Sequence, residues 1–118
     1  MICLMAAHAS ALEEGDRAPA FAAPALTGEG TVELGKYRGK VVYLDFWASW
    51  CGPCRAMAPA FVQAAAQLEP EVRLAKLDTE GAPGIAARYA IRSIPTLVLF
   101  RDGREFARRS GALGTAQI

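Results

Sequence analysis

This sequence of 118 residues contains few cysteines, carries little net charge and has no long apolar run. Its three cysteines are too few, and odd in number, for a small scaffold held together by disulfides. The formal net charge of +1 gives no strong field to attract nucleic acid or anionic lipid, so neither is expected as a partner. No apolar run approaches the roughly 20 residues that a membrane-spanning helix needs, so no membrane span is expected. The length allows one compact domain and not two.

Residues 1–14 are predicted to be a disordered arm or the remnant of a signal peptide, and residues 15–118 to be the folded domain. Residues 1–11 are apolar at first and then small, but they lack the basic start of a secretory signal. Residues 7–9 and 9–11 nevertheless have the small-x-small pattern of a cleavage site. An ordinary frayed N-terminus is the alternative.

The pattern of apolar residues predicts an α/β fold in which a central mixed sheet is flanked by helices. Residues 12–30 are rich in Gly, Pro, Ala and Glu, which indicates an extended arm. Residues 41–47 are almost continuously apolar, as in a central strand covered on both faces. Strands are expected over residues 31–34, 41–47, 72–78, 96–100 and 104–109, and helices over residues 52–68 and 83–89. This order predicts a right-handed parallel crossover.

Two features limit the predicted helices. Pro59 lies inside the helix at 52–68 and is expected to kink it without necessarily ending it. Only one helical turn fits between Gly114 and Ile118, so a final helix is expected to be short or missing. Because apolar central strands need both faces covered, either the N-terminal arm covers part of that face or the sequence is truncated.

The most specific motif is Trp-Cys-Gly-Pro-Cys at residues 50–54, shortly after the strand at 41–47. A helix places residues three apart on one face, so Cys51 and Cys54 can meet at its first turn. Free N–H groups and the positive end of the helix dipole stabilise a thiolate on Cys51 there. Pro53 fits this turn because its missing N–H is not needed. The motif therefore indicates reversible dithiol–disulfide chemistry.

Other uses of a Cys-x-x-Cys pair fit the sequence less well. A structural zinc site needs four ligands, and beyond the pair only Cys3, His8 and distant carboxylates remain. An inert buried pair does not explain Gly-Pro between the cysteines at a helix start. No metal and no cofactor are therefore expected. In the redox interpretation, Cys51 attacks a substrate disulfide as a thiolate and Cys54 resolves the mixed disulfide.

Together with other motifs, this segment resembles the thioredoxin family. The likeness covers about residues 40–114 and rests on residues 45–54, Pro59, Lys76, Ile94-Pro95-Thr96 and Asp102-Gly103. It implies a thioredoxin fold and a cis peptide bond before Pro95, facing the dithiol. It also implies that Asp45 and Lys76 form a buried pair beneath Cys54, with the carboxylate relaying the proton of that thiol.

The residues themselves support these catalytic roles in part. Asp45 lies in an apolar strand, where burial would raise its pKa and suit it to act as a general base; an outward-facing residue is the alternative. Lys76 alternates with Leu77 and, taken alone, reads as a surface lysine. Proline within a sheet is confined to edges and strand starts, which makes Pro95 informative, although an X-Pro bond is usually trans.

The substrate-binding surface is predicted to be apolar and to contact its substrate mainly through the backbone. Small residues let an extended chain approach and pair by strand addition. The residues expected around Cys51 are Trp50, Gly52, Pro53, Ile94, Pro95, Gly111 and Ala112. Such a surface predicts broad specificity for proteins rather than a pocket for a small molecule.

The predicted activity is reduction of protein disulfides, because Gly-Pro between the cysteines resembles the reducing members of the family. Residues 15–40 resemble exported thioredoxin-like reductases, whereas residues 77–113 resemble general thioredoxins. Expected partners are disulfide-containing proteins and an upstream reductase, either a thioredoxin reductase or a membrane thiol carrier. The compartment is the cytoplasm or the periplasm, with the cytoplasm preferred. The alternatives are a non-catalytic protein-interaction module on the same apolar patch and a periplasmic thiol oxidase or isomerase.

Overall fold

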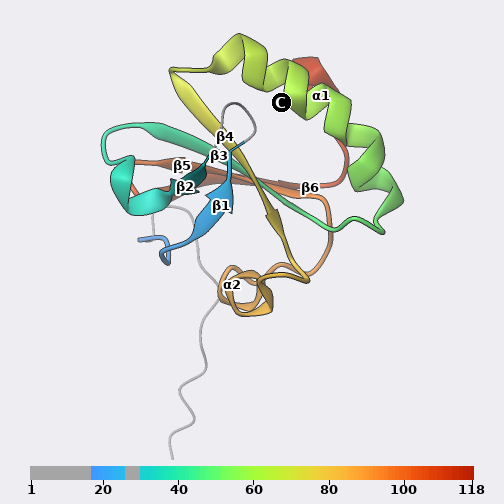
Figure 1. The fold of residues 1–118 in the computed structure, drawn as a ribbon, viewed down its shortest axis with the longest axis horizontal. Coiled ribbons are helices and arrows are strands. Elements are labelled where there is room, and N and C mark those ends of the chain that lie inside the picture. The colour runs from blue at the N-terminus through green and yellow to red at the C-terminus, as the bar shows by residue number, and fades with distance from the viewer. Residues whose placement is uncertain (1–16, 26–29) are drawn as a thin grey trace, which may run out of the picture.

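The computed structural model describes residues 17–25 and 30–118. The predictions for residues 1–14, and the residues Cys3 and His8, lie outside this part of the chain. A four-stranded mixed sheet forms the centre, with α1 (Gly52–Leu68) above it and α2 (Pro83–Arg88) below it in Figure 1. The predicted α/β architecture with a central mixed sheet is therefore confirmed.

The central sheet has the strand order β4-β3-β5-β6. The inner strand β3 (Val41–Trp47) runs parallel to β4 (Val72–Asp78) and antiparallel to the other inner strand, β5 (Thr96–Arg101). The edge strand β6 (Arg104–Ser110) returns antiparallel to β5. Asp102 and Gly103 connect these two strands, both with positive φ, as a two-residue hairpin turn requires.

The helix α1 begins at Gly52 and continues through Pro59 to Leu68. Pro59 is exposed, so its ring points away from the sheet. The face that packs on the sheet repeats every three or four residues, as expected for an amphipathic helix. Its buried residues are Cys54, Met57, Phe61, Ala64 and Ala65.

A two-stranded hairpin covers part of the opposite face of the sheet. It pairs β1 (Ala22–Pro24) with β2 (Thr31–Glu33), and the 3-10 helix η1 (Leu34–Lys36) follows. The sequence predicts β2 but not β1, because three residues of Ala and Pro carry neither alternation nor β-branched side chains. Burial of Ala23 and Val32 beneath the hairpin stabilises it in place of strand propensity.

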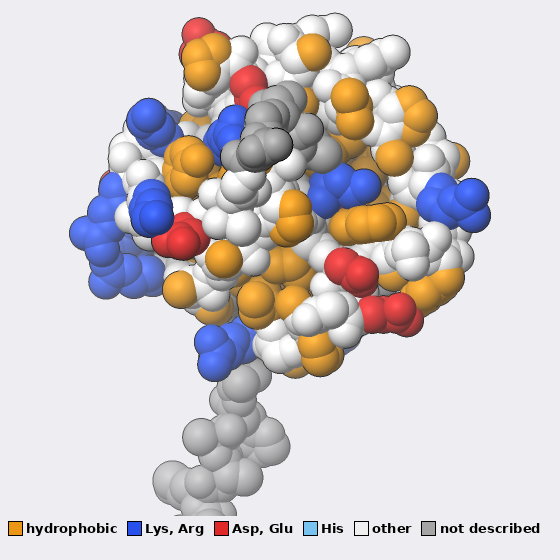
Figure 2. All heavy atoms as spheres, viewed as in Figure 1, with side chains coloured by type: hydrophobic (Ala, Val, Ile, Leu, Met, Phe, Trp, Pro, Cys, Tyr) orange, Lys and Arg blue, Asp and Glu red, His pale blue; other side chains and the backbone are white. Residues whose placement is uncertain are grey.

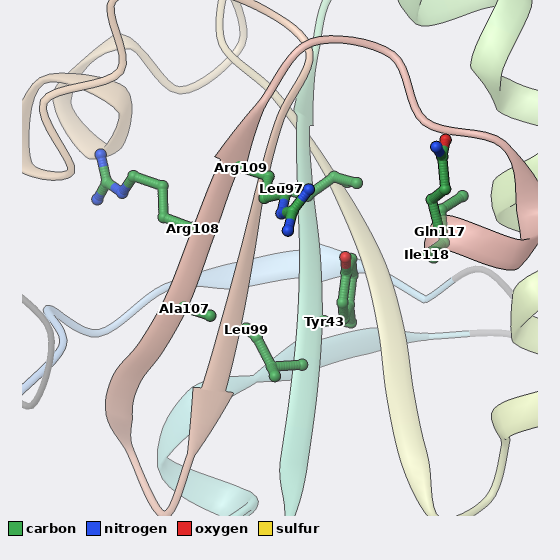
Figure 3. A pocket seen from close by; sticks show the side chains of 8 residues that line it. All are labelled: Tyr43, Leu97, Leu99, Ala107, Arg108, Arg109, Gln117 and Ile118. Carbon is green, nitrogen blue, oxygen red and sulfur yellow. The ribbon is translucent and has the colours of Figure 1, made fainter.

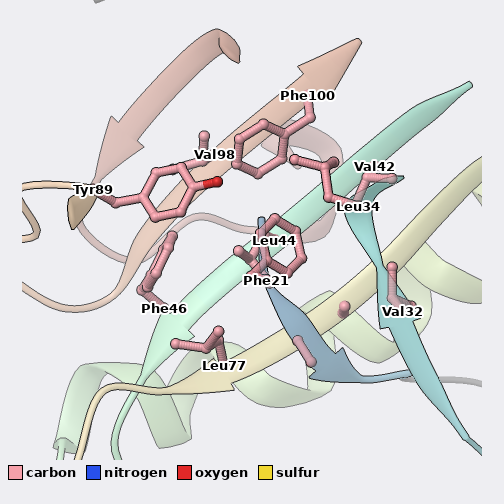
Figure 4. Close-up of a cluster of buried hydrophobic side chains, with 12 residues drawn as sticks. Phe21, Val32, Leu34, Val42, Leu44, Phe46, Leu77, Tyr89, Val98 and Phe100 are labelled. Atoms are coloured by element: carbon pink, nitrogen blue, oxygen red, sulfur yellow. The ribbon is translucent and has the colours of Figure 1, made fainter. Parts of the chain in front are cut away.

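The apolar cluster under this hairpin is built around aromatic rings (Figure 4). The ring of Phe21 lies 5.4 Å from Phe100 and 6.2 Å from Tyr89, measured between centroids. The Tyr89 hydroxyl donates a hydrogen bond to the carbonyl of Pro19. Burial raises the pKa of this hydroxyl, so it stays protonated as a donor. Phe21 and Ala23 are therefore part of the core.

A second apolar cluster joins α1 to the other face of the sheet. Phe61 packs there with Leu74 of β4 and Leu97 of β5. The last element is η2 (Thr115–Gln117), a single 3-10 turn, which confirms the expectation of a short final helix. A cavity of about 350 Å³ lies between η2 and the sheet, lined by Tyr43, Leu97, Leu99, Ala107, Arg108, Arg109, Gln117 and Ile118 (Figure 3).

The surface mixes charged and apolar side chains. On the face shown in Figure 2, Lys and Arg lie among Asp, Glu and apolar residues, so neither sign of charge covers it. The exposed large apolar side chains of the described residues are Trp50, Val62 and Phe106. Within residues 17–25 and 30–118, none of the helices has the length and apolar character needed to cross a membrane.

Candidate active site

Cys51 and Cys54 form a disulfide across the first turn of α1. Their Cα atoms are 5.2 Å apart. Cys51 is the N-cap residue of α1, with an extended backbone, and the N–H of Cys54 donates to its Sγ at 3.2 Å. Pro53 occupies the first turn, where no N–H is missed. The local sequence thus places both sulfurs at the positive end of the helix.

Both sulfurs are buried in this oxidised state. Cys51 is 4% exposed and Cys54 is 2% exposed. Ala48, Trp47 and Ile94 pack around the pair. The Cys51 Sγ lies 3.8 Å from the carbonyl oxygen of Ile94, so the loop before β5 forms a wall of the site.

The peptide bond between Ile94 and Pro95 is cis, as the family resemblance implies. Pro95 is buried, and its carbonyl accepts a hydrogen bond from the N–H of Gly111 at 2.9 Å. Gly111 has a φ of 101°, a conformation that favours glycine. This bond brings the loop after β6 against the loop before β5, so Ile94, Pro95 and Gly111 lie together as expected, with Ala112 next in the chain.

Trp50 directly precedes Cys51 in the chain and is 65% exposed. Its indole N–H donates to Oε1 of Glu80 at 2.5 Å, and the Glu80 N–H donates to Oδ1 of Asp78 at 2.9 Å. Sequence reasoning misses Glu80, because an acidic residue after a strand is no signal by itself. A cavity of about 210 Å³ adjoins the indole, lined by Trp50, Thr79, Ala86, Ile91, Arg92, Ser93 and Ile94.

Asp45 is buried in the middle of β3, with 1% of its surface exposed. Burial raises the pKa of its carboxyl to about 7, although the charge of Lys76 opposes this. Lys76 is its neighbour on β4 in the parallel register. The Lys76 ammonium, however, lies 3.8 Å from the centroid of the Trp47 ring, and the ion pairs of the described residues do not include Asp45. The two residues are adjacent, but Lys76 is half-buried and directed to the indole.

No cluster of three or more metal-ligating side chains occurs within residues 17–25 and 30–118. The joined pair of cysteines can exchange two electrons with another dithiol or disulfide. A thiol–disulfide oxidoreductase is the class of protein that this fold and this pair define. The family model described as Thioredoxin matches residues 31–118, and the chain belongs to the thioredoxin family.

Individual relatives agree with this membership. Thioredoxin C-3 of Corynebacterium nephridii is 53% identical over 77 residues, which are 65% of this chain and 52% of that protein. The chain thus spans about half the length of that relative. The thioredoxin of Mycobacterium bovis is 43% identical over 79 residues, which are 67% of this chain and 68% of that protein.

Solved structures show the same fold. The X-ray structure of Fasciola hepatica thioredoxin superposes with a TM-score of 0.67 at 39% identity, covering 71% of this chain and 80% of that chain. Mitochondrial thioredoxin 3 from Saccharomyces cerevisiae, in its oxidised form, gives a TM-score of 0.62 at 35% identity, covering 67% and 74%. The fold of this chain is therefore the thioredoxin fold.

Proposed function

We propose that the protein reduces the disulfides of other proteins through Cys51 and Cys54. The observation that supports this best is the position of the pair, in which Cys51 caps α1 and the Cys54 N–H donates to its sulfur. In the reduced protein the same N–H and the helix dipole stabilise a Cys51 thiolate. Cys51 is therefore the nucleophile, and Cys54 is the resolving thiol.

The reduced pair supplies two electrons to one substrate disulfide. The Cys51 thiolate attacks one substrate sulfur; a mixed disulfide forms, and the other substrate sulfur leaves as a thiolate that takes up a proton. The deprotonated Cys54 then attacks the Cys51 sulfur. The Cys51–Cys54 bond forms, and the second substrate sulfur leaves as a thiolate that is also protonated. The products are a substrate dithiol and the disulfide form of this protein.

Asp45 is the group that takes the proton of Cys54 in this proposal. Its carboxyl has a pKa of about 7, so near neutral pH it both accepts and releases a proton. Its Oδ1 is buried and has no hydrogen-bond partner within the described part of the chain. Lys76 acts on the same carboxyl through its charge, which favours the ionised form. The site thus carries a base without needing a metal or an organic cofactor.

The substrate-binding surface in this proposal surrounds the disulfide. Half-buried Ile94 and buried Pro95 form a wall beside Cys51, and the other residues of the substrate-binding surface are exposed. Those exposed members are Trp50, Gly52, Pro53, Gly111 and Ala112. Small and flat side chains at these positions let a substrate backbone approach the sulfurs, which favours extended protein segments as substrates.

An upstream donor of two electrons and two protons must restore the dithiol after each turnover. We expect a thioredoxin reductase in the cytoplasm, which is the preferred compartment, or a membrane thiol carrier if the protein acts in the periplasm. Fractionation of the native cells identifies the compartment, and the fraction that reduces the Cys51–Cys54 disulfide of the oxidised protein contains the donor.

The proposal is tested by reduction of insulin disulfides with protein kept reduced by dithiothreitol. Cys51→Ser should abolish the reaction, and Cys54→Ser should accumulate mixed disulfides that persist under non-reducing conditions. Cys3→Ser is the matched control and should keep the activity. Full activity of Cys51→Ser contradicts the proposal.

The direction of electron flow is tested by the redox potential of the pair. A value close to the thioredoxin potential of about −270 mV agrees with a reductase. A value well above about −200 mV indicates an oxidase or isomerase instead.

A further inference from the structure

Three side chains on one face of the sheet determine where the positive charge near Asp45 lies. Asp45 and Trp47 are two residues apart on β3, so their side chains share a face. Lys76 is the direct neighbour of Asp45 on β4 and points to the same face. The Lys76 ammonium therefore has two possible partners, the carboxylate and the indole ring.

The ammonium is bound to the indole. Its Nζ lies 3.8 Å from the Trp47 ring centroid, well inside the distance of about 6 Å at which a cation is attracted to an aromatic face. Oδ1 of Asp45 is left without a hydrogen-bond partner among residues 17–25 and 30–118, although it is buried. Strand pairing places Lys76 beside Asp45, but the Lys76 ammonium is directed to the indole and away from the Asp45 carboxylate.

We propose that Trp47 is a positioning residue, which holds the Lys76 ammonium over its ring and so keeps it from closing into an ion pair with the Asp45 carboxyl. The inference rests on the proposed function, in which Asp45 is the base for Cys54. A closed ion pair would hold the carboxyl ionised and weaken it as a base. With the ammonium on the indole, the carboxyl keeps a pKa suited to proton exchange at neutral pH.

Among the groups around Asp45, Lys76 is the cation whose charge changes the pKa of the carboxyl. On β3 itself, Tyr43 lies on the same face; burial raises the pKa of its hydroxyl, and Arg109 of β6 lowers it. On β5, the register partner of Asp45 is Leu97, which carries no charge. The helix α1 contains Cys54 and is capped by Cys51, and neither cysteine titrates while the two are joined. Of these groups, only Lys76 changes the pKa of Asp45 through its charge.

A cavity lies beside Trp47 and Lys76, so the Lys76 side chain is not enclosed on every side. Its volume is about 340 Å³, and it is lined by Ala22, Pro24, Ala25, Trp47, Lys76, Leu77, Asp78, Gly81 and Ala82. Because Lys76 is half-buried, its flexible stem can swing once the indole is removed. A leucine at position 47 would keep an apolar side chain there but remove the aromatic face.

The test is a carbon-13 NMR titration of the Asp45 carboxyl in the oxidised protein. In Trp47→Leu the pKa of Asp45 should fall by about 1, which is a tenfold change in the ratio of ionised to protonated carboxyl. Trp47→Phe keeps an aromatic face and should keep the pKa close to that of the unchanged protein. In a Lys76→Met background, Trp47→Leu should no longer change the pKa, because the cation is gone.

A second measurement uses the unchanged protein and does not depend on how the variants fold. The ε-methylene protons of Lys76 should be shifted upfield by the ring current of Trp47. The absence of that shift overturns the proposal, and so does an equal fall in the Asp45 pKa with and without Lys76. Both readouts are independent of disulfide reduction, so they separate this proposal from the proposed function.

Discussion

Replacing Asp45 by asparagine should stabilise the oxidised protein at alkaline pH and change it little at acidic pH. The carboxyl is 1% exposed, and burial raises its pKa from 3.8 to about 7. In the unfolded chain it ionises at the lower value, so between the two values the folded protein keeps a proton that the unfolded chain has released. The free energy of unfolding therefore falls as pH rises through this window and is lowest above it.

The size of this loss follows from the two pKa values. At about 1.36 kcal/mol for each pKa unit, it reaches about 4 kcal/mol in the unchanged protein. Asparagine has nearly the same shape and cannot ionise, so the variant avoids the loss. We expect the stability gained in Asp45→Asn to be larger by about 2–4 kcal/mol at about pH 9 than at about pH 4.

Urea denaturation of both oxidised proteins across this pH range measures the difference directly. Asp102→Asn removes an exposed aspartate from the hairpin turn and is the matched control for loss of a negative charge. A difference between Asp45→Asn and the unchanged protein that stays constant with pH would refute the reasoning. It would mean that the buried carboxyl ionises at the same pH in the folded and unfolded chains.

Two further predictions concern β6 and the loop after it. Arg108→Met should lower the free energy of unfolding by about 3–5 kcal/mol, because it leaves Glu105 buried without the Nε–H donor at 2.6 Å. Arg109 lies on the same strand but is exposed, so Arg109→Met should lower the free energy of unfolding by under about 0.5 kcal/mol. Gly111→Ala should lower the free energy of unfolding by about 1–3 kcal/mol, because the φ of Gly111 is 101°. Gly114 has a φ of −79°, so Gly114→Ala should leave the free energy of unfolding nearly unchanged. Urea denaturation measures both pairs, and equal effects within a pair would contradict the prediction.

Strong local patterns explain why much of the fold is predictable. The strand at 41–47 and the helix at 52–68 have in the structure the bounds that the sequence predicts. Both are long, and each has one dominant signal, a continuous apolar run in one case and a helix start at Cys51 in the other. The burial of Asp45 is predictable for the same reason, since its neighbours on the strand are large and apolar.

Features that depend on contacts between distant segments are not predictable in this way. The strand at Ala22–Pro24 exists because Ala23 fits against the core, and its residues have little strand propensity. The hydrogen bond of Glu80 to Trp50 joins residues 30 positions apart. The partner of Lys76 depends on whether the indole or the carboxylate lies within reach, whereas the residues alone suggest a surface lysine and only the family resemblance implies the carboxylate.

The contacts of Phe21 and Tyr89 determine where the smallest folding unit begins. Phe21 lies upstream of residue 31, where the match to the family model starts, yet it is buried against Phe100 and Tyr89. A polypeptide cut back to the matched residues would leave an empty slot in the core and remove the carbonyl of Pro19 that the Tyr89 hydroxyl bonds. We therefore expect the stable unit to extend beyond the residues that the family model matches, and a shortened version of this protein should begin ahead of Pro19.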